Sequence, residues 1–221
     1  MENIIKKLRK TCNSSDGDGF EEAVNNALLE ISNKSSYIPL GGIGSRFKRL
    51  SDGYWILSLE DDSGKKHFLV IIIDTKAGNA INSLSLEKEK NNIKNTINLI
   101  KNNILKESYE DFWIWYIGGN KLPSKGSHGG YRESQNSDSL ITKIFKIQTF
   151  LQKIPNIKKV HVTVFSLDCF IEYYKLLYQN MKLKKLIINQ KNYPFLWVWN
   201  KLFTKPFVIL DNVNFLKSNL K

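Results

Sequence analysis

The sequence predicts an α/β fold in which helices flank a mixed central β-sheet. Two observations support this prediction. Residues 68–73 form an apolar run with the composition of a strand that is buried on both faces. Helical and strand-like hydrophobic patterns then alternate along the rest of the chain, which is typical of α/β proteins.

An early helix is predicted after a polar loop at 14–19, because apolar residues recur there at helical spacing. The residues of this buried stripe are Phe20, Val24, Ala27, Leu28 and Ile31. The loop contains Asp16 and Asp18, but Ser14 and Asn25 stand where a calcium-binding EF-hand needs acidic ligands. We therefore interpret the loop as a helix cap.

Residues 53–59 are rich in aromatic and branched side chains and are predicted to pair with the apolar run. The two strands would form an antiparallel hairpin whose turn is centred near Ser63. Position 52 then lies opposite position 74, so Asp52 faces Asp74 with Cβ atoms roughly 5 Å apart. A bulge or a one-residue slip would instead turn Asp52 to the other face of the sheet.

The remaining predicted elements are a long polar helix at 85–107, a strand at 111–116, a loop at 118–139, a helix at 140–151, a strand at 160–165 and a helix at 170–181. The loop is interpreted as a surface segment, with DNA contact as the alternative. Residues 1–185 are predicted to form one domain. Residues 186–221 are an aromatic-rich C-terminal extension that either packs on the core or docks a partner.

Asp74 and Lys76 follow the buried strand and share one face of it, because side chains alternate along a strand. A carboxylate at the rim of a core is costly unless it is paired or binds a metal. The ion pair between Asp74 and Lys76 meets this need by itself. Asp52 adds a second carboxylate, however, and two close carboxylates repel unless a cation or a shared proton lies between them. Their hard oxygen atoms favour Mg²⁺.

Glu21 is a further candidate because it stands in line with the apolar stripe of the early helix, whereas Glu22 points elsewhere. A glutamate near the start of a helix also interacts favourably with the positive helix N-terminus. That simpler interpretation applies to either glutamate taken alone.

Together these motifs resemble the cleavage domain of FokI-like type IIS restriction endonucleases, within the PD-(D/E)XK nuclease superfamily. The matching segments are Phe20-Glu21, Leu40-Gly41-Gly42, Ser51-Asp52-Gly53, Ile73-Asp74-Thr75-Lys76-Ala77, a later strand at 111–116 and a strand that leads into a helix at 162–168. Ser51 stands where the family usually has proline, the turn between Asp52 and Asp74 is longer, and the segment after Lys76 aligns poorly. An isolated Asp-x-Lys is a weak signal, and the ordered set is considerably more specific.

The resemblance implies a restriction-endonuclease-like core that hydrolyses phosphodiester bonds with a metal ion. Asp52 and Asp74 would hold Mg²⁺, or Mn²⁺ in its place, with the Thr75 backbone carbonyl as a further ligand. Lys76 would orient the attacking water and stabilise charge on the phosphate. Glu21 would bind the metal or steer its water. The products would carry a 5′-phosphate and a 3′-hydroxyl.

The 221 residues carry a net charge of +12, which favours binding to polyanions. Part of this basicity reflects a composition crowded with Asn, Ile and Lys, as expected from an AT-rich genome. Arg46, Lys48 and Arg49 lie just before Asp52 and are candidates for DNA-phosphate contacts, with a solvated basic loop as the equal alternative.

The chain is predicted to be soluble, cytoplasmic and without a membrane partner. It lacks an apolar signal core and a run long enough to span a bilayer. Cys12 and Cys169 are far apart and lack a metal-ligand spacing, as expected of thiols in a reducing compartment.

The resemblance, supported by the basic charge, implies a magnesium-dependent endonuclease of double-stranded DNA, as the small, cleaving subunit of a type IIS restriction enzyme. No segment resembles a DNA-recognition module, so a larger subunit would read the sequence. One such site cuts one strand, so a double-strand break needs a second site. The larger subunit or transient dimerisation would supply it. A stand-alone defence or repair nuclease and a non-catalytic DNA-binding or structural subunit are the alternatives.

Overall fold

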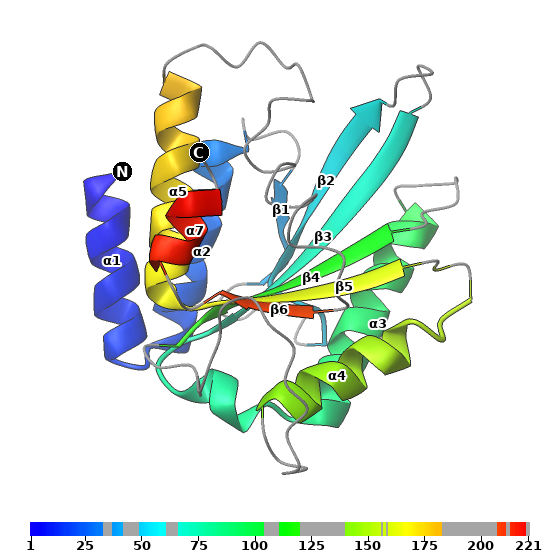
Figure 1. Cartoon of the computed structure of the whole chain (residues 1–221). Helices are drawn as coiled ribbons and strands as arrows, with labels where there is room; N and C mark the ends of the chain where they lie inside the picture. Colours follow the sequence, from blue (N-terminus) through cyan, green and yellow to red (C-terminus); the bar gives the residue numbers. More distant parts are fainter. Residues whose placement is uncertain are drawn as a thin grey trace.

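The computed structural model confirms an α/β fold with a mixed sheet and helices on both faces (Figure 1). The described residues are 1–32, 37–41, 49–60, 66–103, 111–119, 140–155, 157, 159–182, 207–210 and 213–219.

Six strands form the described sheet, and their spatial order follows the chain. They are β1 (Tyr37–Pro39), β2 (Gly53–Glu60), β3 (Lys66–Lys76), β4 (Asp111–Gly118), β5 (Lys159–Phe165) and β6 (Phe207–Leu210). Strands β1, β2 and β3 pair antiparallel, whereas β3, β4, β5 and β6 pair parallel. The antiparallel hairpin and the parallel part therefore share β3.

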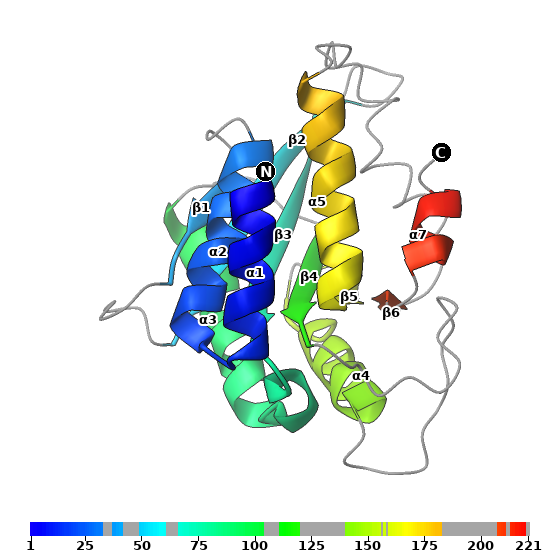
Figure 2. The same cartoon turned by 90° about the vertical axis from the view of Figure 1, so that its left-hand side faces the viewer.

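Helices cover both faces of this sheet. They are α1 (Glu2–Asn13), α2 (Gly17–Ile31), the short 3₁₀ helix η1 (Ala80–Ser83), α3 (Leu86–Asn103), α4 (Leu140–Leu151), α5 (Leu167–Lys182) and α7 (Val213–Asn219). Helices α1, α2, α5 and α7 lie on one side of the strands, and α3 and α4 lie on the other (Figure 2).

Strand β3 is apolar on both faces because each face contributes to a separate core. Ile71 and Ile73 pack among residues of α1, α2 and α5. Val70 and Ile72 pack among residues of α3 and α4. Asp74 and Lys76 continue the second row, so the alternation of the strand brings them out on the α3 side of the sheet.

The predicted hairpin register is confirmed. Gly53 pairs with Ile73 and Glu60 pairs with Lys66, as expected for a turn centred on position 63. Residues 61–65, the turn itself, lie outside the described residues. The register thus brings the start of β2 beside the end of β3.

Several predicted boundaries were wrong. Helix α2 begins at Gly17 inside the predicted loop, because the Asp16 carboxylate accepts the Gly19 N–H at 3.0 Å and caps the helix there. The capping interpretation of this loop is confirmed. Helix α5 begins at Leu167, three residues before the predicted start, because the Ser166 hydroxyl accepts the Cys169 N–H at 3.3 Å.

Within 186–221 the structure describes β6 and α7. Strand β6 pairs with β5, and Leu216 of α7 is buried in the core beside α5. Lys217 also pairs with Glu172 of α5 at 3.2 Å. The aromatic residues of 193–203, and the predicted loop from 120 to 139, lie outside the described residues.

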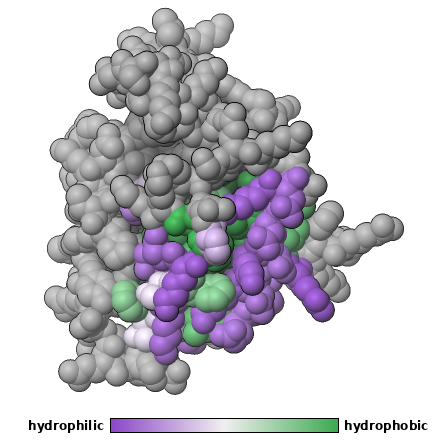
Figure 3. Space-filling model, turned by 90° about the vertical axis from the view of Figure 1, so that its right-hand side faces the viewer, coloured by the Kyte–Doolittle hydropathy of each residue, from purple (hydrophilic) through white to green (hydrophobic). Residues whose placement is uncertain are grey.

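Among the described residues that Figure 3 shows on this face, most are hydrophilic, and hydrophobic residues are visible among them. Among the helices of the described residues, none has both the length and the apolar character needed to cross a membrane. Cys12 and Cys169 are buried, and neither forms a disulfide bond.

Candidate functional site

Asp52 is fixed at the start of β2 by its backbone and its side chain. Its N–H donates to the Ile73 carbonyl at 3.0 Å, and its own carbonyl accepts the Leu40 and Gly41 N–H groups at 2.8 and 3.0 Å. Its carboxylate oxygen Oδ2 accepts both the N–H and the hydroxyl of Thr75, each at 2.6 Å. The carboxylate of Asp52 is therefore directed at the end of β3.

Asp74 and Lys76 form an ion pair at that same end of β3. The Asp74 side chain is 2% exposed and the Lys76 side chain 17% exposed. The Lys76 ammonium also lies 3.3 Å from Glu89 Oε1 and 6.0 Å from the centre of the Tyr116 ring. Two carboxylates from different elements therefore hold one lysine.

Glu89 is a site residue that the sequence analysis missed. It lies in the first turn of α3, is buried, and accepts a hydrogen bond from the Tyr116 hydroxyl at 3.4 Å. The available signal was its place in the apolar stripe of that helix, three residues after Leu86 and four before Ile93. A charged residue in such a stripe indicates a side chain that points inward.

Glu21 points inward from α2, as predicted. Its Oε1 atom is buried and makes no hydrogen bond, and a Cβ at Gly41 would overlap its carboxylate. Glu22 instead forms an exposed ion pair with Lys7 at 2.7 Å. Burial, and then the charges of Asp18 and Asp74, raise the pKa of Glu21 above its ordinary value.

The charged groups of this cluster change one another's ionisation. Burial and the neighbouring Asp74 raise the pKa of Asp52 to about 8 and that of Glu89 to about 7. Burial lowers the pKa of Lys76, but Asp74, Glu89 and Asp52 outweigh it, so the net pKa lies above the ordinary value. Lys76 therefore stays an ammonium, while burial and the neighbouring charge disfavour ionisation of Asp52 and Glu89.

Helix α3 also holds the loop before Asp52. The Ser51 N–H donates to Thr96 Oγ1 at 2.9 Å, and the Asn95 side chain donates to the Arg49 carbonyl at 3.2 Å. Proline lacks an N–H and would lose the bond to Thr96. Ser51 thus makes a hydrogen bond that proline at this position could not make.

The predicted basic loop is described only at its end. Arg49 is exposed in the turn before β2. Arg46 and Lys48 lie outside the described residues.

The residues at the end of β3 suit a hard divalent cation in chemical type. Asp52 and Asp74 offer carboxylate oxygens, and Glu21 Oε1 is a buried acceptor without a donor. In the described parts of the chain, no three His, Cys, Asp or Glu side chains form a ready-made metal-binding group. The N–H and the hydroxyl of Thr75 both donate to Asp52.

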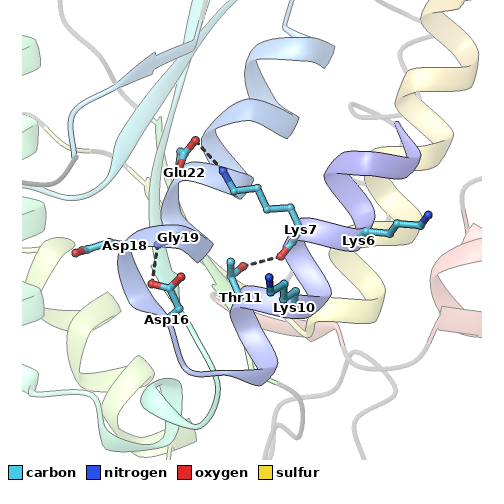
Figure 4. A pocket seen from close by; sticks show the side chains of 8 residues that line it. All are labelled: Lys6, Lys7, Lys10, Thr11, Asp16, Asp18, Gly19 and Glu22. Carbon is cyan, nitrogen blue, oxygen red and sulfur yellow. Dashed lines mark hydrogen bonds and ion pairs between the residues drawn. The ribbon is translucent and has the colours of Figure 1, made fainter.

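An open groove of about 640 Å³ lies elsewhere, between α1 and the start of α2 (Figure 4). Its lining residues are Lys6, Lys7, Lys10, Thr11, Asp16, Asp18, Gly19 and Glu22. Basic and acidic side chains are mixed along it, and it includes none of the four predicted catalytic residues.

Comparison of the chain with protein-family models, curated proteins and solved structures found no match.

Proposed function

We propose that this chain is the catalytic subunit of a magnesium-dependent DNA endonuclease of the FokI type. The observation that carries this proposal is the register of the β2–β3 hairpin. It supports a position of Asp52 beside the end of β3, where the alternation of the strand brings Asp74 and Lys76 to one face. Two carboxylates and a lysine in this arrangement suit metal-assisted hydrolysis of a phosphodiester.

The charge balance of the cluster supports a role for Mg²⁺. Asp52 and Asp74 repel one another, and this repulsion together with burial disfavours ionisation of Asp52. Asp52 and Asp74 would hold the ion, with Glu21 and the Thr75 carbonyl as further oxygen donors. When bound, Mg²⁺ would lower the pKa of a coordinated water and neutralise charge on the phosphate.

Three side chains of the protein would orient Asp52, stabilise charge on the phosphate and position the attacking water. Thr75 orients Asp52 through two hydrogen bonds, so this carboxylate is already placed before substrate binds. Lys76 keeps its positive charge and would donate to the attacking water or to a phosphate oxygen. Glu21 Oε1 accepts no hydrogen bond from the described residues, and it would accept one from that water.

The proposed substrate is double-stranded DNA, read by a second, larger subunit. The net charge of +12 supports a polyanionic partner, and the sequence contains no recognisable DNA-reading module. A double-strand break would require a second active site, supplied by that subunit or by transient dimerisation.

Cleavage of supercoiled plasmid tests the proposal. We expect nicking or cutting with Mg²⁺ that stops with EDTA and falls by at least about 10³-fold in Asp74→Asn, because loss of a metal-binding carboxylate removes the chemistry. Asp168→Asn, which changes an exposed carboxylate on α5, is the matched control and should cleave normally. Absence of metal-dependent cleavage, with and without any large subunit that co-purifies, would contradict the proposal.

The same assay separates a guided subunit from an autonomous nuclease. Site-specific cutting only in the presence of a co-purifying chain would establish the guided subunit. Robust cutting by the purified chain alone would instead favour a stand-alone nuclease.

A further inference from the structure

Lys76 has two carboxylate partners that reach it by different routes. Asp74 is two residues away on the same strand, so its ion pair is local. Glu89 is 13 residues along the chain, and only the packing of α3 against the sheet brings it to 3.3 Å from the ammonium. Both carboxylates are almost fully buried, at 2% and 3% exposed.

The two oxygens of Glu89 have separate contacts. Oε2 accepts the Tyr116 hydroxyl at 3.4 Å, and Oε1 is the atom nearest the Lys76 ammonium. Tyr116 of β4 pairs with Asp74 of β3. Its hydrogen bond therefore holds Glu89 beside the strand that carries Asp74 and Lys76. This arrangement directs one oxygen of Glu89 at Lys76, and the Glu89 carboxyl group also hydrogen-bonds the side chain of Asp74.

Burial of Glu89 is unfavourable without a partner. Its position belongs to the apolar stripe of α3, where a hydrophobic side chain would be at least as stable. A role in holding the Lys76 ammonium would explain why a carboxylate occupies this position. If the proposed function is correct, Asp74 also has to serve a metal ion, and a divalent cation at Asp74 would repel the ammonium paired with it.

We propose that Glu89 is the positioning residue for Lys76, which holds the ammonium at the site whether or not Asp74 is paired with it. The expected effect of Glu89 on cleavage rests on the proposed function. The contact between Glu89 and Lys76 does not rest on it, and the protection of Lys76 by Glu89 can be measured without metal or DNA.

The first test is the reactivity of lysine amines toward a limiting acylating reagent, read by mass spectrometry of the full chain after digestion. We expect Lys76 to stay protected in Asp74→Asn, within about threefold of wild type, and to react at least about tenfold faster in Asp74→Asn/Glu89→Gln, because Lys76 loses its second buried carboxylate partner only in the double variant. Glu87→Gln is the matched control. It removes an exposed glutamate of the same helix and should affect Lys90, its partner at 3.2 Å, but not Lys76.

Thermal unfolding and circular dichroism of each variant exclude loss of the fold as the cause of faster labelling. Equal reactivity of Lys76 in Asp74→Asn and in the double variant would overturn the proposal, because Glu89 would then add no protection.

The second test uses single-turnover cleavage with saturating DNA and Mg²⁺. Glu89→Gln should lower the rate by at least about tenfold in the wild-type background and have little effect in Lys76→Ala, because two residues that act through one another are not additive. A loss of equal size in both backgrounds would show that Glu89 does not act through Lys76. If wild-type protein does not cleave, the proposed function fails while the labelling result still decides the role of Glu89.

Discussion

Asp52 is a carboxylate whose ionisation the fold opposes. Burial and the charge of Asp74 raise its pKa to about 8, far above the value in an unfolded chain. Between these two pKa values the folded state holds a proton that the unfolded chain has released. The contribution of Asp52 to the stability of the protein without metal therefore falls as the pH rises from about 4 to about 8.

Asp52→Asn should remove most of this pH dependence. Asparagine can still accept the two hydrogen bonds from Thr75, but it carries no charge to repel Asp74. We expect the variant to have a Tm a few degrees above wild type at pH 9 and little changed at pH 5, since about 1 kcal/mol shifts the Tm of a domain of this size by about 2–4 °C.

Differential scanning fluorimetry across this pH range, without divalent cations, measures the effect. Asp168→Asn serves as the control because Asp168 is exposed and pairs only at the surface with Arg9. A Tm difference between Asp52→Asn and wild type that stays constant from pH 5 to pH 9 would contradict the argument.

The residues predicted from the sequence are those whose positions depend on local geometry. The alternation of side chains along one strand predicts that Asp74 and Lys76 share a face, and the pairing within one hairpin predicts that Asp52 lies beside them. Glu89 was missed because its place depends on the angle at which α3 packs on the sheet. No rule of spacing along the chain specifies that angle.

At the scale of elements, α3 supports the site from two positions. Glu89 in its first turn contacts Lys76, and Thr96 two turns later accepts the Ser51 N–H. Thr96 is fully buried and donates its hydroxyl proton to the Asn92 carbonyl at 2.9 Å. The loop that carries Asp52 is therefore positioned by the same helix that anchors the lysine.

Thr96→Val should show this support directly. Valine has nearly the same shape but leaves the buried Ser51 N–H without an acceptor, so we expect a loss of about 1–3 kcal/mol in the free energy of unfolding. Thr96→Ser keeps the hydroxyl and should retain the hydrogen bond, with a smaller loss from the missing methyl group. Urea denaturation compares the two variants with wild type, and a Thr96→Val variant as stable as wild type would show that the hydrogen bond does not support the loop.

Strands and helices with strong hydrophobic patterns were predicted well. Helix α4 has the predicted bounds, and the predicted strands coincide with β2, β3, β4 and β5 to within a few residues. Helix α1 and strand β1 were not predicted. Strand β1 has only three residues, too few for a periodic pattern, and its Tyr37 is held by a tertiary hydrogen bond to Asn25 of α2.

At the scale of the whole molecule, two cores enclose the sheet and leave the site at the end of β3. The hairpin brings in Asp52, α2 brings in Glu21 and α3 brings in Glu89, so three elements distant in sequence meet there. The restriction-endonuclease-like identity of this core stays a proposal. Four carboxylates and one lysine make the site itself acidic within a chain of net charge +12.

This contrast makes a prediction about DNA binding. An acidic centre repels phosphates in the absence of metal, so binding must come from basic residues around it. Arg49 is exposed in the turn just before Asp52, and its backbone is tethered to α3. If it contacts a phosphate, Arg49→Ala should reduce the slope of log K against log salt by about 1 and weaken binding for all DNA sequences alike.

Arg9→Ala is the control for this measurement because it removes the same single charge, from +12 to +11. Arg9 is already paired with Asp168 at 2.9 Å, on helices α1 and α5. Fluorescence anisotropy of a labelled duplex in Ca²⁺ between 50 and 200 mM NaCl, about the range over which such contacts are resolved, compares the variants. Equal slopes for both variants would mean that DNA senses only the net charge, whereas a change confined to Arg49→Ala would place the DNA path beside the end of β3.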